Sequence, residues 1–240
     1  MLQVRDLGCA RGGVPVLAGI SFDLAAGEAL ILRGPNGVGK TTLLRVLAGL
    51  QPASAGQVDY PEEQGAYASH ADGIKSALSV VENLQFWADI HGQGGSGSTL
   101  REGTDVRTPP GAAGQPPTLP PGGGYTPTQG RGLDAVLEIF DLTDLRDRLA
   151  GTLSAGQKRR LGLARLAVIG RKVLFLDEPT VSLDGFSVKL FAEWLRGHLA
   201  AGGVAVIATH IDLGLDAPEL DLTPFRAVPE AGGGSDEAFL

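Results

Sequence analysis

Apolar runs of strand length alternate with segments of helical periodicity along this chain. The runs at 29–33, 173–176 and 203–208 are almost entirely apolar, which is typical of strands buried on both faces of a sheet. Apolar residues at helical spacing predict helices over 40–49, 79–90, 133–140, 155–168 and 187–200. This alternation predicts an α/β fold built around a largely parallel sheet.

Both ends of the chain depart from this alternation. The segments 2–4, 14–17 and 20–22 predict shorter, partly antiparallel strands ahead of the first buried one. At the other end, 219–240 includes the glycine-rich stretch 230–237. Chain termini of this composition are poorly ordered unless something ties them down, and we expect a mobile tail.

One internal segment also breaks the pattern. Residues 92–132 include twelve glycines and seven prolines among 41 residues, with few side chains able to form a core. Such a segment cannot bury enough apolar surface to offset the entropy of ordering it. We predict an unstructured surface insertion, and a docking segment for a partner protein is the alternative.

Composition and charge limit the classes of function. The chain has 240 residues, of which 43% are hydrophobic, and a formal net charge of −7, which argues against a nucleic-acid binder. Its single cysteine, Cys9, cannot form an internal disulfide, which fits a reducing compartment. No apolar run approaches the about 20 residues that span a bilayer, and the first residues do not form a secretory signal. We therefore predict a soluble chain, whose membrane part, if it acts in transport, is another protein.

A glycine-rich loop between the first buried strand and the first helix carries the strongest chemical signal. It reads GPNGVGKT over 34–41, the spacing of a phosphate-binding loop in the strand–loop–helix context that such a loop requires. The small residues let backbone N–H groups and the helix start face a phosphate, while Lys40 reaches the outer phosphates and the Thr41 hydroxyl binds Mg²⁺. A simple helix-capping turn would leave the lysine unexplained. The predicted contacts to ATP or GTP are those of Gly34, Pro35, Asn36, Gly37, Val38, Gly39, Lys40, Thr41 and Thr42.

The second buried strand ends in two acids. Asp177 and Glu178 follow four apolar residues and so fall at the carboxyl end of the strand, where ligands bind in such sheets. Asp177 is the expected Mg²⁺ ligand, directly or through water. Glu178 is the expected catalytic group that polarises the attacking water. Solvated acids at a strand end are the alternative, and the phosphate-binding loop in the same chain argues against it.

A third motif begins the helix at 155–168. Ser154 and Gln157 have the spacing of a capping box. The next three residues, 158–160, are all cationic and lie in the first helical turn, where the helix dipole disfavours positive charge. A phosphate bound at this helix start would remove the conflict.

The phosphate-binding loop, the LSAGQ segment at 153–157, the strand ending in two acids and a later Thr209-His210 occur in this order. In this the chain resembles the ATP-binding subunit of ABC transporters. The resemblance implies a P-loop NTPase fold, with one ABC-type nucleotide-binding domain over 1–218. It further implies a RecA-like core and a helical subdomain over about 70–165 that contains the insertion.

The resemblance also implies several functional roles. Two copies of the chain would sandwich ATP and Mg²⁺, with Ser154, Gly156 and Gln157 contacting the nucleotide bound by the other copy. Asp184 would lie at that interface. His210 would contact the γ-phosphate and join Lys40 and Glu178 as a catalytic residue.

Two positions depart from the family pattern. No aromatic residue precedes Phe22 to stack on adenine, and Arg11 occupies the matching place, where a guanidinium plane can stack on a base. His70 stands where the family has a metal-binding glutamine. Imidazole is a poorer Mg²⁺ ligand than oxygen, so His70 contacts the metal through water or serves coupling instead.

The segments 9–11, 70–75, 81–87 and 153–161 further resemble the ATPase of the cytochrome c maturation haem exporter. This branch implies membrane-spanning partner subunits, a peripheral place on the cytoplasmic face of the inner membrane, and no direct binding of haem or nucleic acid by this chain. One alternative is an ATPase for another exported substrate. The others are a soluble ABC protein acting on ribosomes or DNA and a non-catalytic nucleotide sensor; the single domain and net charge of −7 argue against the former, and Glu178 against the latter.

Overall fold

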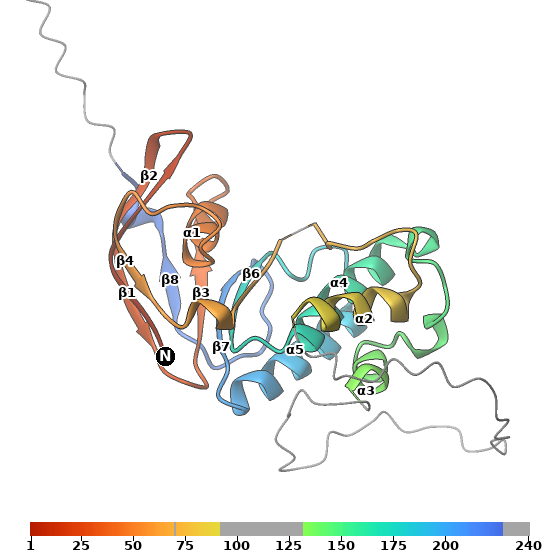
Figure 1. Cartoon of the computed structure of the whole chain (residues 1–240). Coiled ribbons are helices and arrows are strands. Elements are labelled where there is room, and N and C mark those ends of the chain that lie inside the picture. The colour runs from red at the N-terminus through yellow and green to blue at the C-terminus, as the bar shows by residue number, and fades with distance from the viewer. Residues whose placement is uncertain (70, 92–131, 228–240) are drawn as a thin grey trace, which may run out of the picture.

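The computed structural model describes residues 1–69, 71–91 and 132–227 (Figure 1). Its strands are β1 (Leu2–Arg11), β2 (Val14–Leu24), β3 (Ala29–Arg33), β4 (Ala55–Asp59), β5 (Gly65–Ala68), β6 (Val173–Asp177), β7 (Val204–Ala208) and β8 (Glu219–Asp221). Its α-helices are α1 (Lys40–Leu47), α2 (Val80–Ile90), α3 (Gly132–Ile139), α4 (Ala155–Ile169) and α5 (Gly185–Ala200). All five predicted helices are confirmed, with ends that differ by no more than two residues.

A five-stranded parallel sheet in the order β5-β6-β7-β3-β8 forms the centre of the molecule. The predicted buried strands are confirmed as β3, β6 and β7, and every residue of β6 and β7 is buried, as the continuous apolar runs indicated. Strands β5 and β8 at the two edges were not predicted. They are four and three residues long and are covered less completely, so they lack the continuous apolar signal.

A second sheet, antiparallel in the order β2-β1-β4, covers the phosphate-loop side. The predicted antiparallel pairing of the opening strands is confirmed, although 14–17 and 20–22 belong to the single strand β2. Helix α1 lies between the two sheets, and its leucines share one core with β1, β2 and one face of the parallel sheet. The other face of that sheet packs against α5 and the group α2, α3 and α4. The parallel sheet therefore separates two cores.

The structure shifts the expected limits of the domain. We expected the compact fold to end at residue 218, but β8 pairs in parallel with β3, and the Ala227 backbone N–H donates to the Val16 carbonyl at 2.9 Å. Leu222 between them is completely buried. The compact fold therefore continues to residue 227, because these residues complete the edge of the sheet and one of its cores.

The structure can also be compared with the expected end of the helical subdomain and with the expected insertion. The predicted subdomain limit at 165 falls inside α4, a single helix that contacts both the helical group and the parallel sheet. The predicted insertion lies outside the described residues except for Gly132, which begins α3.

The burial of Leu222 predicts how much the segment 219–227 contributes to the free energy of unfolding. Leu222→Ala should lower the free energy of unfolding by about 2–5 kcal/mol, because it removes buried methyl groups and leaves a cavity. Leu50 is 62% exposed, so Leu50→Ala is the matched control and should change it by less than about 0.5 kcal/mol. Urea denaturation of both variants measures the difference. Equal effects would show that 219–227 is not part of the cooperative fold.

Candidate functional site

The carboxyl ends of the parallel strands meet at one level of the sheet. Ala208 at the end of β7 is paired with Leu32 of β3 on one side and with Asp177 of β6 on the other. The residues that follow these strands therefore emerge side by side at the same edge. They are the predicted phosphate-binding loop after β3, Glu178 after β6, and His210 after β7.

The loop from Gly34 to Gly39 has the backbone that only glycine adopts readily. Gly34, Gly37 and Gly39 have φ angles of 130°, 81° and 119°. Gly39 is also the N-cap of α1, so the loop runs directly into the positive end of the helix. Strand β2 crowds this point, because a Cβ on Gly39 would lie 2.8 Å from Leu17 Cδ1 and 2.9 Å from Val16 Cγ1. The loop can thus bind an anion with backbone groups, and it has no room for a side chain at Gly39.

Lys40 brings a positive charge into this loop. Its side chain is only 8% exposed, and its Nζ donates to the carbonyls of Gly34 at 2.8 Å and Pro35 at 3.4 Å. Among the described residues, no carboxylate forms an ion pair with it. A nearly buried ammonium neutralised only by carbonyl dipoles is arranged to receive an anionic ligand.

Asp177 forms the oxygen-rich side of the site. It is 5% exposed, and the Tyr67 hydroxyl from β5 donates to its Oδ2 at 3.3 Å. Burial raises the pKa of Tyr67, and the carboxylate of Asp177 raises it further, while a hydrogen bond with Arg45 of α1 opposes them. The tyrosine therefore remains a protonated donor that fixes one oxygen of Asp177. Sequence reasoning did not find Tyr67, since a lone tyrosine in a short strand carries no motif.

Glu178 and His210 contact each other across the strand ends. His210 Nε2 lies 3.3 Å from Glu178 Oε1. Glu178 has a φ of 49°, which is uncommon for a residue with a side chain, and its N–H donates to the Ala208 carbonyl at 2.9 Å. The structure thus brings together two residues that the sequence assigned separately to the same chemistry.

Arg33 fixes the backbone beside His210 and was also missed. Its Nη1 donates to the Thr209 carbonyl at 2.5 Å, and its Nη2 to Glu219 Oε1 at 2.6 Å. The pairing holds the pKa of Glu219 below its usual value, so the carboxylate stays charged. The unpredicted strand β8 therefore helps to position the residues that follow β7.

The predicted capping box at α4 is confirmed. Ser154 Oγ accepts from the Gln157 N–H at 3.2 Å, and Gln157 Oε1 accepts from the Ser154 N–H at 2.9 Å. The serine hydroxyl hydrogen remains available, so the cap does not prevent Ser154 from donating to a ligand. Gly156 lies close to the loop after β6, since a Cβ there would be 3.2 Å from the Ser182 carbonyl.

The three cations at the start of α4 have acceptors within the chain. Lys158 Nζ donates to the Gly151 carbonyl at 3.1 Å, Arg160 pairs with Asp141, and Arg159 contacts carbonyls and Asp72. The cations therefore do not by themselves require a phosphate at this helix start, and a phosphate there stays a prediction.

Asp184 is the N-cap of α5. Its Oδ1 accepts from the Ser187 N–H at 2.7 Å, and this hydrogen bond holds the pKa of Asp184 below its usual value. Near it in the chain, Val181 and Phe186 expose large apolar side chains, as does Ile211 beside His210. The carboxylate thus has a local structural role, and the apolar side chains leave a surface that could be covered by another molecule.

Of the two positions that depart from the expected pattern, the structure describes only Arg11. Arg11 is exposed at the end of β1, opposite Val14, in the hairpin whose second strand covers Gly39. His70 lies outside the described residues. The structure therefore puts Arg11 on the hairpin beside the phosphate loop and leaves its predicted role in adenine stacking a prediction.

Comparison with known proteins gives a consistent result. Residues 17–181 match the family described as ABC transporter. The chain is 55% identical to the cytochrome c biogenesis ATP-binding export protein CcmA of Roseobacter denitrificans, covering 100% of this chain and 99% of that protein, and 52% identical to CcmA of Ruegeria pomeroyi, with the same coverage. The solved structure of cbiO1 from Clostridium perfringens, part of the ABC transporter complex cbiONQ, aligns with a TM-score of 0.61 at 24% identity, over 88% of this chain and 78% of that one.

Within the described ranges, none of the helices is both long and apolar enough to cross a membrane. The full-length identity, the family match and the arrangement of the sheet edge agree. This chain belongs to the ABC transporter family, in the group of the cytochrome c biogenesis ATP-binding export proteins.

Proposed function

We propose that this protein is the ATP-hydrolysing subunit of a membrane complex for cytochrome c biogenesis. It couples ATP binding and hydrolysis to haem export or to release of a haem-loaded carrier. The observation that carries the proposal is the sheet edge, where a lysine-bearing glycine loop, a buried aspartate and a Glu178–His210 pair follow adjacent strands. The relatives, which are named for cytochrome c biogenesis and export, support the choice of complex.

The residues at this edge fit ATP and Mg²⁺. The loop from Gly34 to Gly39 turns through three left-handed glycines into a helix N-terminus, which suits the β- and γ-phosphates. Hydroxyl and carboxylate oxygens are the ligands that Mg²⁺ prefers, and Thr41 and Asp177 supply them. When bound, the ion supplies positive charge to the phosphate oxygens and to the leaving group.

Each catalytic side chain acts at a defined point. Lys40 neutralises charge on the β- and γ-phosphates, beside the amides of the loop. Glu178 accepts a hydrogen bond from water and orients it towards the γ-phosphorus. His210, which contacts the carboxylate of Glu178, stabilises the charge on the departing phosphoryl group.

A second copy of the chain completes the site in this proposal. Ser154, Gly156 and Gln157 at the start of α4 contact the nucleotide held by the partner copy, and Asp184 lies at the interface. The exposed apolar side chains of Val181, Phe186 and Ile211, which follow β6 and β7, support a partner on this face. ATP binding closes the pair, and hydrolysis opens it.

The membrane-spanning subunits of the exporter are the other partners. We place the protein at the cytoplasmic face of the inner membrane, as a peripheral subunit that binds neither haem nor nucleic acid itself. An ABC exporter for another substrate is the alternative, because the nucleotide site does not identify which substrate the complex transports.

The isosteric substitution Glu178→Gln should trap an ATP-bound dimer, because it removes the group that orients water and leaves nucleotide binding intact. We expect ATP turnover to fall by at least about 100-fold, and light scattering with saturating MgATP to give twice the monomer mass. Glu193 lies exposed on α5, so Glu193→Gln is the matched control and should behave as wild type. A monomeric, fully active Glu178→Gln protein would contradict the assignment.

Steric crowding at Gly39 predicts different effects at two glycines of the loop. Gly39→Ala places a Cβ within 2.9 Å of Val16 and Leu17, so we expect binding of a fluorescent ATP analogue to weaken by more than about tenfold. Gly37→Ala has the same kind of φ but no atom within 4 Å of the new Cβ, so backbone strain alone should lower the free energy of unfolding by about 1–2 kcal/mol, and binding of the analogue should weaken less than in Gly39→Ala. Equal losses would show that crowding by β2 does not shape the loop.

Copurification tests the complex itself. The tagged protein, isolated from detergent-solubilised membranes, should bring down multi-spanning membrane subunits and a haem-containing component, with a lysate lacking the tag as control. Permeases without haem would retain an ABC exporter and reject the haem branch. Ribosomes or nucleic acid in their place would reject the transporter subunit.

A further inference from the structure

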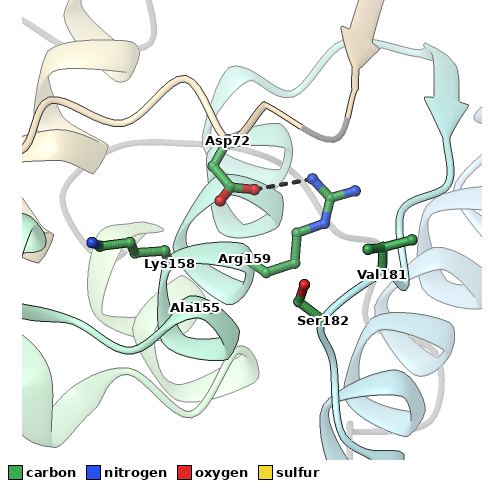
Figure 2. Close-up of a pocket in the computed structure, with 6 residues that line it drawn as sticks. All are labelled: Asp72, Ala155, Lys158, Arg159, Val181 and Ser182. Carbon is green, nitrogen blue, oxygen red and sulfur yellow. Dashed lines mark hydrogen bonds and ion pairs between the residues drawn. The ribbon is translucent and has the colours of Figure 1, made fainter.

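A nearly buried arginine on α4 connects the loop after β6 to the residues that follow β5. Arg159 is 4% exposed, and its guanidinium donates four hydrogen bonds, of which Figure 2 draws the one to Asp72. Nε donates to the Pro179 carbonyl at 2.9 Å and Nη2 to the Glu178 carbonyl at 2.9 Å. Nη1 donates to the Ser69 carbonyl at 2.6 Å and to Asp72 Oδ1 at 3.0 Å. One planar group thus holds the loop after β6, the end of β5 and the segment that follows it.

Among these four acceptors, the carbonyl of Glu178 belongs to the residue that we propose orients the attacking water. Glu178 is held in a left-handed conformation, which costs roughly 1–2 kcal/mol for a residue with a side chain. Two other contacts also define it, since its N–H donates to Ala208 and its carbonyl accepts from the Val181 N–H at 3.3 Å. The charge-assisted bonds from Arg159 to Glu178 and Pro179 are stronger than neutral ones and therefore help to hold this conformation.

A pocket lies beside this arginine. It measures about 170 Å³ and lies between the start of α4 and the loop after β6, lined by Asp72, Ala155, Lys158, Arg159, Val181 and Ser182. In Figure 2 the Lys158 side chain points away from this loop, whereas the Arg159 guanidinium carries the drawn bond to Asp72. Beside this pocket, the hydrogen bonds of Arg159 form a polar link between α4 and the loop after β6.

Charge balance ties the arginine to the segment after β5. Asp72 is the carboxylate paired with Arg159 among the described residues, and it is itself only 22% exposed. Its carboxylate also raises the pKa of Arg165, one turn and a half further along α4, against the larger lowering by burial. Removing either partner of this pair would leave a poorly solvated charge, which is unfavourable.

We propose that Arg159 is a positioning residue for Glu178. By holding the Glu178 and Pro179 carbonyls together with the Ser69 carbonyl and Asp72, it makes the geometry of the water-orienting carboxylate depend on where Ser69 and Asp72 lie. The inference rests on the proposed role of Glu178 in ATP hydrolysis. A residue that only stabilises the fold would instead lower thermal stability and leave the turnover of the folded protein unchanged.

The test separates turnover from nucleotide binding. For Arg159→Gln we expect kcat to fall by about 100-fold, as for a small misplacement of a catalytic group. The affinity for a fluorescent ATP analogue should stay within about threefold, because the phosphate loop is untouched. Arg159→Lys keeps the charge but not the planar group and should lose about tenfold in kcat. Arg146→Gln, at an exposed arginine paired with Asp134 of α3, is the matched control and should keep wild-type kcat.

Several outcomes would overturn the inference. Wild-type kcat in Arg159→Gln or in Arg159→Lys would show that the guanidinium bonds do not position Glu178. If kcat of the variant returns to the wild-type value at temperatures well below its unfolding midpoint, where the variant is fully folded, Arg159 has a structural role alone. If Arg159→Gln does not fold, Arg159→Lys and Asp72→Asn decide, since both should lower kcat and combine less than additively.

Failure of the proposed function itself looks different. A wild-type protein without ATPase activity, or a fully active Glu178→Gln protein, would remove the mechanism on which the inference rests. An active wild type with an unchanged Arg159→Gln variant removes only the inference.

Discussion

The site depends on the position of β7 between β3 and β6. Ala208 pairs with both neighbouring strands, so the residues following three strands emerge at one level. A shift of one residue in this register would exchange the faces of β7 and separate Glu178 from His210. Continuous burial of β6 and β7 specifies the register, because each face packs into a different core. The chemistry thus rests on ordinary apolar packing of two five-residue strands.

Much of this arrangement could be predicted from the sequence because its signals are local. The apolar runs predicted β3, β6 and β7, the glycine spacing predicted the turn into α1, and the Ser154–Gln157 spacing predicted a capping box. Glu178 and His210 could be assigned to one site because parallel strands end at the same edge. Each of these predictions depends on residues close in sequence or on a general rule of sheet topology.

The missed features depend on contacts between distant residues. Strand β8 reads Glu-Leu-Asp, a pattern without strand propensity, and forms because β3 offers a free edge to pair with. Arg159 appeared unfavourable at a helix N-terminus, yet carbonyls 19 and 90 residues away accept its hydrogen bonds. Tyr67 and Arg33 likewise act through partners 110 and 176 residues distant. Local patterns cannot predict which distant acceptor a donor will meet.

The order of strands in the sheet has a consequence for synthesis. Strand β3, which carries the phosphate loop, is the third of the described strands in chain order, yet its two neighbours, β7 and β8, are the last two of them. The pair Arg33–Glu219 joins residues 186 positions apart. While the chain emerges from the ribosome, the loop therefore has neither flanking strand, and such long-range pairing is slow to form. A nucleotide bound at the loop can therefore stabilise the fold only once β7 and β8 have been made and have paired with β3.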